Sequence, residues 1–480
     1  MAKNPTPDEP REPARNNSAS RDIATSIHPY TNLKLHETEG PLVITEGDGV
    51  FVRGEDGKMY LEGLAGLWCV SLGFSERRLA EAAYRQMLKL PFYHTFAHKA
   101  TDIGIELAEK LLSIAPAPMS KVFFVNSGSE ANDTVVKLVW YYNNAAGRPR
   151  KKKIISRNKG YHGVTVASAS LTGFPNNHLD FDLPIANILH VDCPHFYRFA
   201  LPGETEEAFA GRMADSLEQR ILSEGADTVA AFIAEPIMGA GGVLLPPATY
   251  WEKIQAVLRK YDVLLIADEV ISAFGRTGDM WGSTTFGMQP DMMTCAKALS
   301  SGYLPIGAVL VSEEIYRGLV KQSEKIGVFS HGFTYSGHPV ASAVALETLK
   351  IYEADDILSH VRRVAPRMQA GLRRFADHPL VGEVRGIGLI GALELVADKK
   401  TKTPFDPAEA VGPFLVKRAH HHGVILRPLG DSIAFCPPFI IKEAEIDLMF
   451  ERFALALDDT FAMVRERGLM ESALIPALAK

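Results

Sequence analysis

The chain alternates short apolar runs with segments of helical period between about Lys121 and Ser312. The apolar runs, which we interpret as strands, are KVFFV, KIISR, VAAFIAEP, VLLIADEV and IGAVLVS. Strands that are apolar on both faces imply a sheet covered on both sides, as in largely parallel α/β folds. The pattern therefore predicts a central α/β domain.

Different patterns flank this region. Before it, PLVITEGDGVFVRGEDGKMYLEG predicts a strand meander with turns at GDG and EDGK. After Pro339, two helical stretches lead to VGEVRGIGLIGALELV, which predicts an alternating strand pair. We expect residues 76–335 to form a large domain, and residues 26–75 and 336–480 a smaller one. Residues 1–25, polar and proline-rich, are expected to be a disordered tail or an arm that orders on a partner.

Composition narrows the class of protein. Of 480 residues, 46% are hydrophobic and 22% charged, which is typical of globular domains, and the net charge of −6 does not favour nucleic acid or anionic membranes. No apolar run reaches the roughly 18 residues of a membrane helix. The four cysteines are scattered without metal-binding spacing, which predicts reduced thiols in a cytoplasmic protein.

The segment VFFVNSGSEANDTVVKLVWYY predicts a strand, a turn of small residues and a helix. Ser127, Gly128 and Ser129 occupy the turn at the helix N-terminus. Free backbone N–H groups and the positive end of the helix dipole make such a turn a site for an anion, and the two hydroxyls add donors. A serine that only caps the helix is the alternative.

Two further segments place polar groups after predicted strands. In VLLIADEV, Asp268 and Glu269 follow the apolar part of the strand, and ligands of open α/β sheets bind beyond such carboxyl ends. The alternative is a solvated strand end. Tyr161 and His162 lie in the glycine-flanked loop GYHG after KIISR. A tyrosine there can stack on a flat ligand, or it can be an ordinary half-buried ring.

Three other motifs do not predict sites. GIGLIG matches the dinucleotide-binding pattern, but a strand follows where a helix should begin, so we interpret its glycines as close backbone approaches. RPRKKK lacks interleaved aromatic residues and is interpreted as a solvated loop. The adjacent imidazoles of His420, His421 and His422 point about 100° apart on a helix, so no metal site is expected.

Lys297 is the only charged residue in DMMTCAKALSSGYLPIGAVLVS after its opening aspartate. Apolar neighbours would lower the pKa of its amine and make it a nucleophile toward carbonyl groups; the alternative is a lysine whose ammonium reaches water. Together, in chain order, the motifs offer an anion cup, a stacking ring, a carboxylate after a strand and a sheltered lysine. A pyridoxal phosphate site requires such a set, with the lysine as Schiff base and an acid facing the pyridine nitrogen.

With these motifs the chain resembles the class III pyridoxal-phosphate aminotransferases, in particular the ω-aminotransferase or amine:pyruvate group. The resemblance extends from about His28 to about Ile441 and rests on NSGSEAND, GYHG, AEPIMGAGG, LLIADEVISAFGRTG, CAKALSSGYLPIGAV and HGFTYSGHP, in matching order and spacing. It implies fold type I, with a mainly parallel, seven-stranded-type sheet in a large domain and a small α+β domain from both termini. It also implies an obligate homodimer, or a tetramer, with active sites at the interface.

The resemblance implies roles for individual residues. Lys297 would form the Schiff base and carry protons, and Asp268 would keep the pyridine nitrogen protonated. The other cofactor-binding residues would be Ser127, Gly128, Ser129, Tyr161, His162, Glu235 and Val270, joined by Thr334 of the other subunit.

Two residues are expected to bind the substrate. Trp68 in GLWCVSLG would form an aromatic pocket wall, and Arg427 in ILRPLGDSI would bind a carboxylate. Arg385 in EVRGIG competes for the second role, but its position at a strand end favours a structural one.

The implied reaction is a two-stage transfer of an amino group. An amine, such as a diamine or an ω-amino acid, would give its nitrogen to the cofactor, and a keto acid, expected to be pyruvate, would then receive it. A decarboxylase or aminomutase with the same fold is one alternative. A catalytically silent binding protein is another, against which intact Lys297 and Asp268 argue. The expected partners are these small molecules and a second copy of the chain, and neither nucleic acid nor a membrane.

Overall fold

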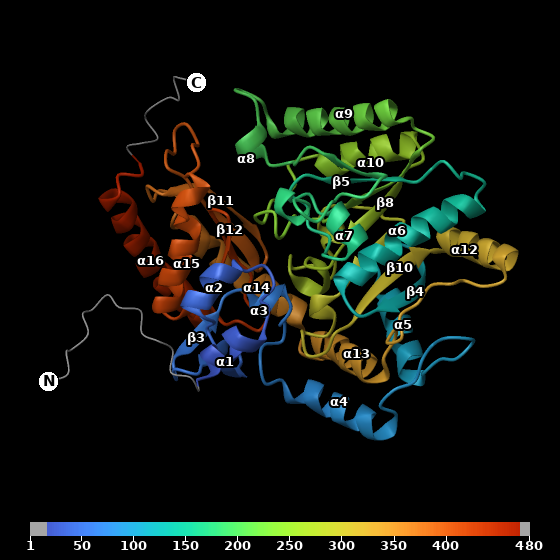
Figure 1. The fold of residues 1–480 in the computed structure, drawn as a ribbon, viewed down its shortest axis with the longest axis horizontal. Coiled ribbons are helices and arrows are strands. Elements are labelled where there is room, and N and C mark those ends of the chain that lie inside the picture. Colours follow the sequence, from blue (N-terminus) through green and yellow to red (C-terminus); the bar gives the residue numbers. More distant parts are fainter. Residues whose placement is uncertain (1–16, 471–480) are drawn as a thin grey trace.

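The computed structural model describes residues 17–470, in which a seven-stranded sheet lies beside two four-stranded sheets (Figure 1). The large sheet has the strand order β4-β10-β9-β8-β7-β5-β6. Its strands are β4 Met119–Val125, β5 Lys153–Arg157, β6 Ile188–Val191, β7 Val229–Ala234, β8 Leu264–Asp268, β9 Met292–Cys295 and β10 Gly307–Ser312. Only β10 is antiparallel to its neighbours, so the mainly parallel sheet predicted from the sequence is confirmed.

Helices cover both faces of this sheet, because side chains alternate along each buried strand. Ile233 and Ile266 pack with α6 on one face, whereas Phe232 and Leu265 pack with α9 and α10 on the other. The helices along this region are α6 Gly128–Ala145, α7 Val166–Leu171, α8 Phe196–Phe199, α9 Glu206–Glu224, α10 Tyr250–Lys260, α11 Gly282–Thr285 and α12 Glu313–Ile326. In Figure 1, α9 and α10 lie at one edge of the picture, apart from α6 and α12.

Segments from both chain ends form the smaller sheets. The first has the order β1-β2-β3-β13 and the second β11-β12-β15-β14. Their strands are β1 Ile44–Asp48, β2 Phe51–Gly54, β3 Met59–Glu62, β11 Val381–Ile387, β12 Ile390–Leu395, β13 Val424–Ile425, β14 Arg427–Leu429 and β15 Ser432–Phe435. The predicted meander and strand pair are both antiparallel as expected. Because β13 pairs with β3, segments more than 360 residues apart lie side by side.

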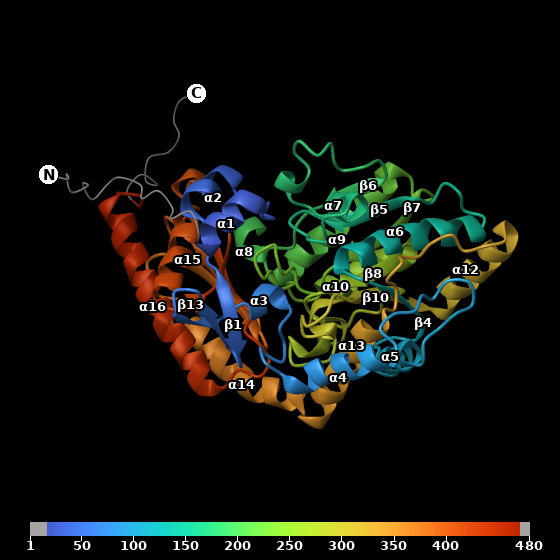
Figure 2. The same ribbon diagram turned by 60° about the horizontal axis from the view of Figure 1, so that its bottom comes forward.

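The remaining helices lie around the smaller sheets or, in the case of α4, α5 and α13, beside the large sheet (Figure 2). They are α1 Ser18–Thr25, α2 Leu33–Glu39, α3 Ala65–Trp68, α4 Arg77–Lys89, α5 Asp102–Ser113, α13 Pro339–Ala354, α14 Ile357–Arg373, α15 Val411–His421 and α16 Glu443–Glu466. Helix α13 packs on α4 and α5, so it contacts elements on the other side of the predicted boundary at residue 335. The domain boundaries stay predictions. Within residues 17–470, no helix combines the length and the apolar character needed to cross a membrane.

The predicted N-terminal tail falls partly outside the described residues. Residues 1–16 lie outside them, whereas Ser18–Thr25 form helix α1. The side chain of Asn17 caps this helix by accepting a hydrogen bond from the Ser20 backbone N–H at 2.8 Å. The end of the predicted tail is therefore helical, because the chain supplies its own cap.

The glycines of GIGLIG lie in the β11–β12 hairpin. A Cβ added to Gly386 would lie 2.7 Å from the Ile390 carbonyl oxygen and 2.9 Å from Gly391 Cα. Only glycine permits this close approach of two backbones. The interpretation of this motif as a strand pair is confirmed.

Candidate active site

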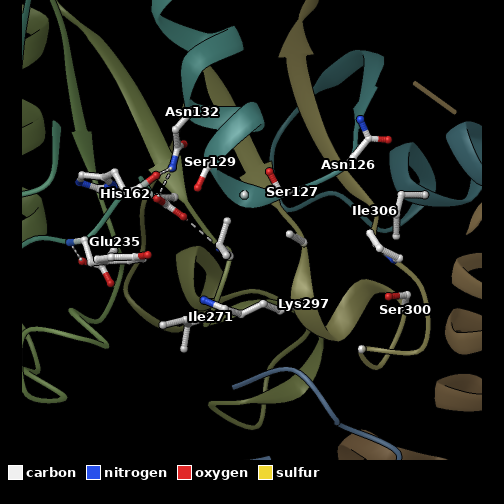
Figure 3. A pocket seen from close by; sticks show the side chains of 18 of the residues that line it. Asn126, Ser127, Ser129, Asn132, His162, Glu235, Ile271, Lys297, Ser300 and Ile306 are labelled. Carbon is white, nitrogen blue, oxygen red and sulfur yellow. Dashed lines mark hydrogen bonds and ion pairs between the residues drawn. The ribbon is translucent and has the colours of Figure 1, made fainter. Parts of the chain in front are cut away.

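Polar side chains from five strands of the large sheet meet at one edge. Ser127 follows β4, Tyr161 follows β5, Glu235 follows β7, Asp268 ends β8 and Lys297 follows β9. These strands run in the same direction, so their carboxyl ends lie together, which is where ligands of open α/β sheets bind. The side chains line a cavity of about 330 Å³ (Figure 3).

All but one of the predicted cofactor-binding residues line this cavity. They are Ser127, Gly128, Ser129, Tyr161, His162, Glu235, Asp268, Val270 and Lys297. Residues from distant parts of the chain are therefore brought together as the motifs implied. The exception is Thr334, which is exposed and lies outside this chain's cavity.

The Ser127–Ser129 turn forms one wall and begins helix α6. Ser127 Oγ accepts a hydrogen bond from the Glu130 N–H at 3.1 Å, and Ser129 Oγ accepts one from the Val164 N–H at 3.2 Å. Among residues 17–470, the backbone N–H groups of Gly128 and Ser129 have no acceptor. Free N–H groups at the positive end of a helix dipole bind anions such as phosphate.

Two glycines keep this wall open. A Cβ on Gly128 would lie 3.0 Å from both methyl groups of Val270, and a Cβ on Gly163 would lie 2.5 Å from Ser129 Oγ. Gly163 also has a φ of 131°, which L side chains rarely adopt. The glycines therefore leave room beside Val270 that larger residues would fill.

Asp268 is a buried carboxylate held from three directions. Its Oδ2 accepts a hydrogen bond from Asn132 Nδ2 at 2.8 Å and lies 2.7 Å from His162 Nδ1, while its Oδ1 accepts from the Val270 N–H at 3.1 Å. Figure 3 shows Asn132 and His162 linked to this carboxylate by dashed lines. A carboxylate fixed in this way presents a steady negative charge to a ligand in the cavity.

Glu235 supports the loop that carries Tyr161. Its Oε1 accepts from the Tyr161 N–H at 3.0 Å, and its Oε2 accepts from the Gly239 N–H at 2.9 Å. Burial raises the pKa of Glu235 above its ordinary value, and burial also raises the pKa of the Tyr161 phenol. Tyr161 thus remains a neutral, half-buried ring at the cavity, as stacking on a flat ligand requires.

Lys297 lies across the cavity from the Ser127–Ser129 turn (Figure 3). It begins the short 3₁₀ helix Lys297–Leu299 with a φ of 47°, an unusual backbone conformation that occurs mainly at functional positions. Among residues 17–470, its Nζ has no ion-pair or hydrogen-bond partner. Burial lowers the pKa of Lys297, with Asp268 partly opposing the shift, so a larger share of the amine is free to attack a carbonyl carbon.

The predicted substrate residues lie outside the cavity lining. Trp68 is buried with Leu64, Ile237 and Ile271, and of these only Ile271 lines the cavity. Arg427, on β14, is half-buried near Tyr161 and Tyr30, and burial lowers the pKa of its guanidinium. Its guanidinium has no hydrogen-bond or ion-pair partner within residues 17–470. Trp68 therefore packs with Ile271, and Arg427 lies near Tyr161, and both Ile271 and Tyr161 line the cavity.

Arg385 is engaged in structural contacts. Its guanidinium pairs with Glu383 and Glu394 at 2.6 Å and donates to Gly242 O at 2.8 Å and Ser432 Oγ at 2.8 Å. Four of the five N–H donors of this guanidinium are thus engaged within the fold, and both Glu383 and Glu394 balance its charge. The structural interpretation of this arginine agrees with its contacts.

Asn132 lies within the motif NSGSEAND but is not among the predicted site residues. It is buried in α6, and its Nδ2 donates both to Asp268 Oδ2 and to the His162 carbonyl oxygen at 2.7 Å. Asn132 lies four residues after Gly128 and therefore on the same helix face. The sequence signal for this role is the position of Asn132, a polar residue next to the apolar Ala131 on the buried side of α6.

Comparisons with known proteins give one consistent result. The model of the family "Aminotransferase class-III" matches residues 34–457. The chain is 54% identical over 433 residues to a protein named gamma aminobutyrate transaminase 3, chloroplastic, from Solanum lycopersicum. The matched region covers 90% of this chain and 83% of that protein. It is 57% identical to the solved omega transaminase from Pseudomonas jessenii in complex with PMP, with a TM-score of 0.93 over 94% of this chain and 99% of that one. It is 43% identical to a PMP-bound aminotransferase from Vibrio fluvialis, with a TM-score of 0.91 over 94% and 99% of the two chains.

Proposed function

This chain belongs to the class III aminotransferases, and we propose that its donors are ω-amino compounds, such as ω-amino acids or diamines, and that its acceptor is pyruvate. Relatives named for γ-aminobutyrate and solved structures titled omega transaminase support this donor class. The observation that carries the proposal is Arg427, a half-buried guanidinium beside the cavity without a carboxylate partner among residues 17–470.

The enzyme depends on pyridoxal phosphate and transfers an amino group to a keto acid. The residues present fit this cofactor, because the free N–H groups of Gly128 and Ser129 suit its phosphate and the space kept by Gly128 and Gly163 suits a flat ring. Bound pyridoxal phosphate supplies an aldehyde that takes up the amino group and a ring that accepts an electron pair.

The chain's own residues would do the remaining work. The Ser127–Ser129 turn would hold the phosphate, Asp268 would face the ring nitrogen, and Tyr161 would cover the ring. Lys297 Nζ, whose lowered pKa lets it accept and return a proton, would move the proton at the substrate carbon that bears nitrogen. His162 and Asn132 would hold Asp268 in place rather than contact the substrate.

Arg427 would discriminate between the two half-reactions. A keto acid needs a cation for its carboxylate, and a guanidinium offers a planar, two-pronged partner. A donor without an α-carboxylate needs that charge kept away from its apolar chain. Since Arg427 has no fixed partner within residues 17–470, its long side chain can turn toward a carboxylate or away from an amine.

Replacing Arg427 with alanine tests this role. We expect Arg427→Ala to weaken the reaction with pyruvate and L-alanine by about 2–4 kcal/mol, the usual cost of removing one partner of a sheltered charge pair. A carboxylate-free amine should react with the pyridoxal form almost as before. Single-turnover loss of the cofactor's colour with alanine and with such an amine measures the two effects. Equal losses for both donors would assign the carboxylate to another residue.

A donor screen tests the substrate class itself. Purified enzyme is incubated with pyruvate and a series of amines, ω-amino acids and α-amino acids, and the alanine formed is measured. We expect diamines and ω-amino acids to give the fastest alanine formation. Carbon dioxide release or an isomerised donor would instead indicate the decarboxylase or aminomutase reaction, and activity confined to α-amino acids would contradict the proposal.

Asn132 is expected to position Asp268. Asn132→Ala should lower kcat by about tenfold or more and weaken cofactor binding, because a hydrogen bond to a charged group contributes about 1.5–3 kcal/mol. Asn143→Ala is a matched control, since Asn143 is also buried on α6 but donates to Val139 O at 2.9 Å, away from the cavity. Both variants should lose stability in thermal unfolding. A loss of kcat and cofactor affinity in both would mean that Asn132 only supports the helix.

We also propose a homodimer with shared active sites. Large apolar side chains are exposed in neighbouring segments, at Phe92, Tyr93 and Phe96 and at Val328 and Tyr335. Segments around these positions line a second cavity of about 730 Å³, and Thr334 is exposed nearby in the chain. A second copy covering this surface would bring Thr334 to the other active site. Light scattering after size-exclusion chromatography distinguishes monomer, dimer and tetramer.

A cytoplasmic location is part of the proposal. Its support is the set of four cysteines, all of which are free thiols in the described residues. Cell fractionation checks this location. Enrichment in an organelle, such as the chloroplast or mitochondrion after which some relatives are named, would contradict it.

A further inference from the structure

A cluster of metal-binding side chains lies in the N-terminal segment, residues 17–40, which we call the arm. Asp22 Oδ2 lies 2.7 Å from His28 Nε2 and 3.2 Å from His36 Nε2. The two imidazole rings stack at 4.2 Å between centroids with a tilt of 32°. The three ligand atoms all lie within 4.8 Å of one another. Two nitrogens and one oxygen thus converge on a single point from α1, α2 and the loop between them.

We propose that Asp22, His28 and His36 bind one divalent cation of the zinc class. Tetrahedral zinc with ligand bonds of about 2.0–2.2 Å separates its ligand atoms by about 3.3 Å. The His36–Asp22 distance already has this value, and the His28–Asp22 distance needs an increase of about 0.6 Å. An imidazole that binds a metal through Nε2 carries its hydrogen on Nδ1, so bonds to the ion would replace the present contacts of both Nε2 atoms with Asp22.

The ligands select the kind of ion. Imidazole nitrogens favour zinc, copper, nickel and iron, whereas magnesium and calcium prefer sites made of oxygen atoms. The carboxylate adds one negative charge to two neutral rings. The side chain of His36 is almost fully buried, while those of Asp22 and His28 are about a quarter to a third exposed. An ion can therefore enter from solvent and keep a water molecule as its fourth ligand.

The ion would fasten the arm at the mouth of the active site. Tyr30 lies between His28 and His36 in the chain, and its hydroxyl accepts a hydrogen bond from Asn177 Nδ2 at 2.6 Å. Its ring meets Tyr161 edge-on with centroids 6.4 Å apart. In Figures 1 and 2, α1 and α2 lie together at the surface. A cation held by both flanking histidines restricts the loop that carries Tyr30.

Cobalt(II) and zinc(II) are the probes. The holoenzyme is freed of metal with a chelator, desalted and titrated with cobalt, whose visible absorption reports tetrahedral coordination, and zinc is then used to displace it. We expect one ion per chain and no sulfur-to-cobalt absorption, because no cysteine belongs to the cluster. Zinc should also slow amide hydrogen exchange in residues 22–36. A wild-type enzyme that binds no stoichiometric cobalt or zinc overturns the proposal.

Variants assign the site. His36→Gln and Asp22→Asn should each weaken metal binding by about tenfold or more, the effect of disturbing ligands of a metal site. His421→Gln is the control, since it removes an exposed imidazole from the His420–His422 triplet. Unchanged affinity in both cluster variants, or an equal loss in the control, overturns the assignment. If a cluster variant does not fold, X-ray absorption at the zinc edge of the wild-type enzyme identifies the ligands instead. A spectrum without two imidazole ligands would overturn the assignment.

Discussion

Lys297→Ala is expected to abolish steady turnover while cofactor binding largely persists. The substitution removes both the amine that reacts with the cofactor's aldehyde and the group that carries the proton, so activity should fall by many orders of magnitude. The contacts of the Ser127–Ser129 turn, Tyr161 and Asp268 remain. Alanine formation from pyruvate measures turnover, and the absorbance of the protein after desalting measures bound cofactor.

Lys151→Met provides the matched control for this experiment. Lys151 is also buried, but its ammonium interacts with Tyr261 O at 3.3 Å and Asp262 Oδ2 at 3.1 Å, and none of these residues lines the cavity. This variant should lose stability and keep its activity per folded molecule. Near-normal turnover in Lys297→Ala would contradict the whole proposed mechanism.

Asp268→Asn is expected to lower activity by roughly 10²-fold or more, as the loss of one preorganised charge does in other enzymes. The amide keeps the shape of the carboxylate but removes the charge that faces the ring nitrogen. In the wild-type protein Asn132 and His162 contact the charged Oδ2 of Asp268. The variant would place a neutral amide at this position. Cofactor affinity should fall as well, and titration of the cofactor-free protein with pyridoxal phosphate measures it.

The neighbouring carboxylate serves as the control. Glu269 is buried on the other side of the strand end, where it accepts hydrogen bonds from Ser272 Oγ at 2.6 Å and the Gly282 N–H at 3.0 Å. Glu269→Gln should reduce stability without the selective loss of cofactor affinity. Wild-type rates in Asp268→Asn would mean that Asp268 only organises the end of β8.

The parts of the fold predicted from sequence are those with strong local patterns. The runs at β5, β7, β8 and β10 are continuous and apolar, because each strand is buried on both faces by helices. The buried face of α6, with Ala131, Val135, Leu138, Val139 and Tyr142, follows the helical period as expected. The sequence does not predict strands β6 and β9, because runs of four residues such as Met-Met-Thr-Cys carry too little pattern.

The sequence by itself determined the chemical groups of the active site and their order along the chain. Each motif is local, since a strand end, a glycine turn or a sheltered lysine is recognisable from its immediate neighbours. Only the tertiary structure decided which groups touch. It joined Asn132 and His162 to Asp268, engaged Arg385 in structural ion pairs while leaving Arg427 without a partner in the described residues, and brought His28 and His36 to the same oxygen of Asp22. Contacts of this kind depend on how distant elements pack, and local periodicity holds no information about that packing.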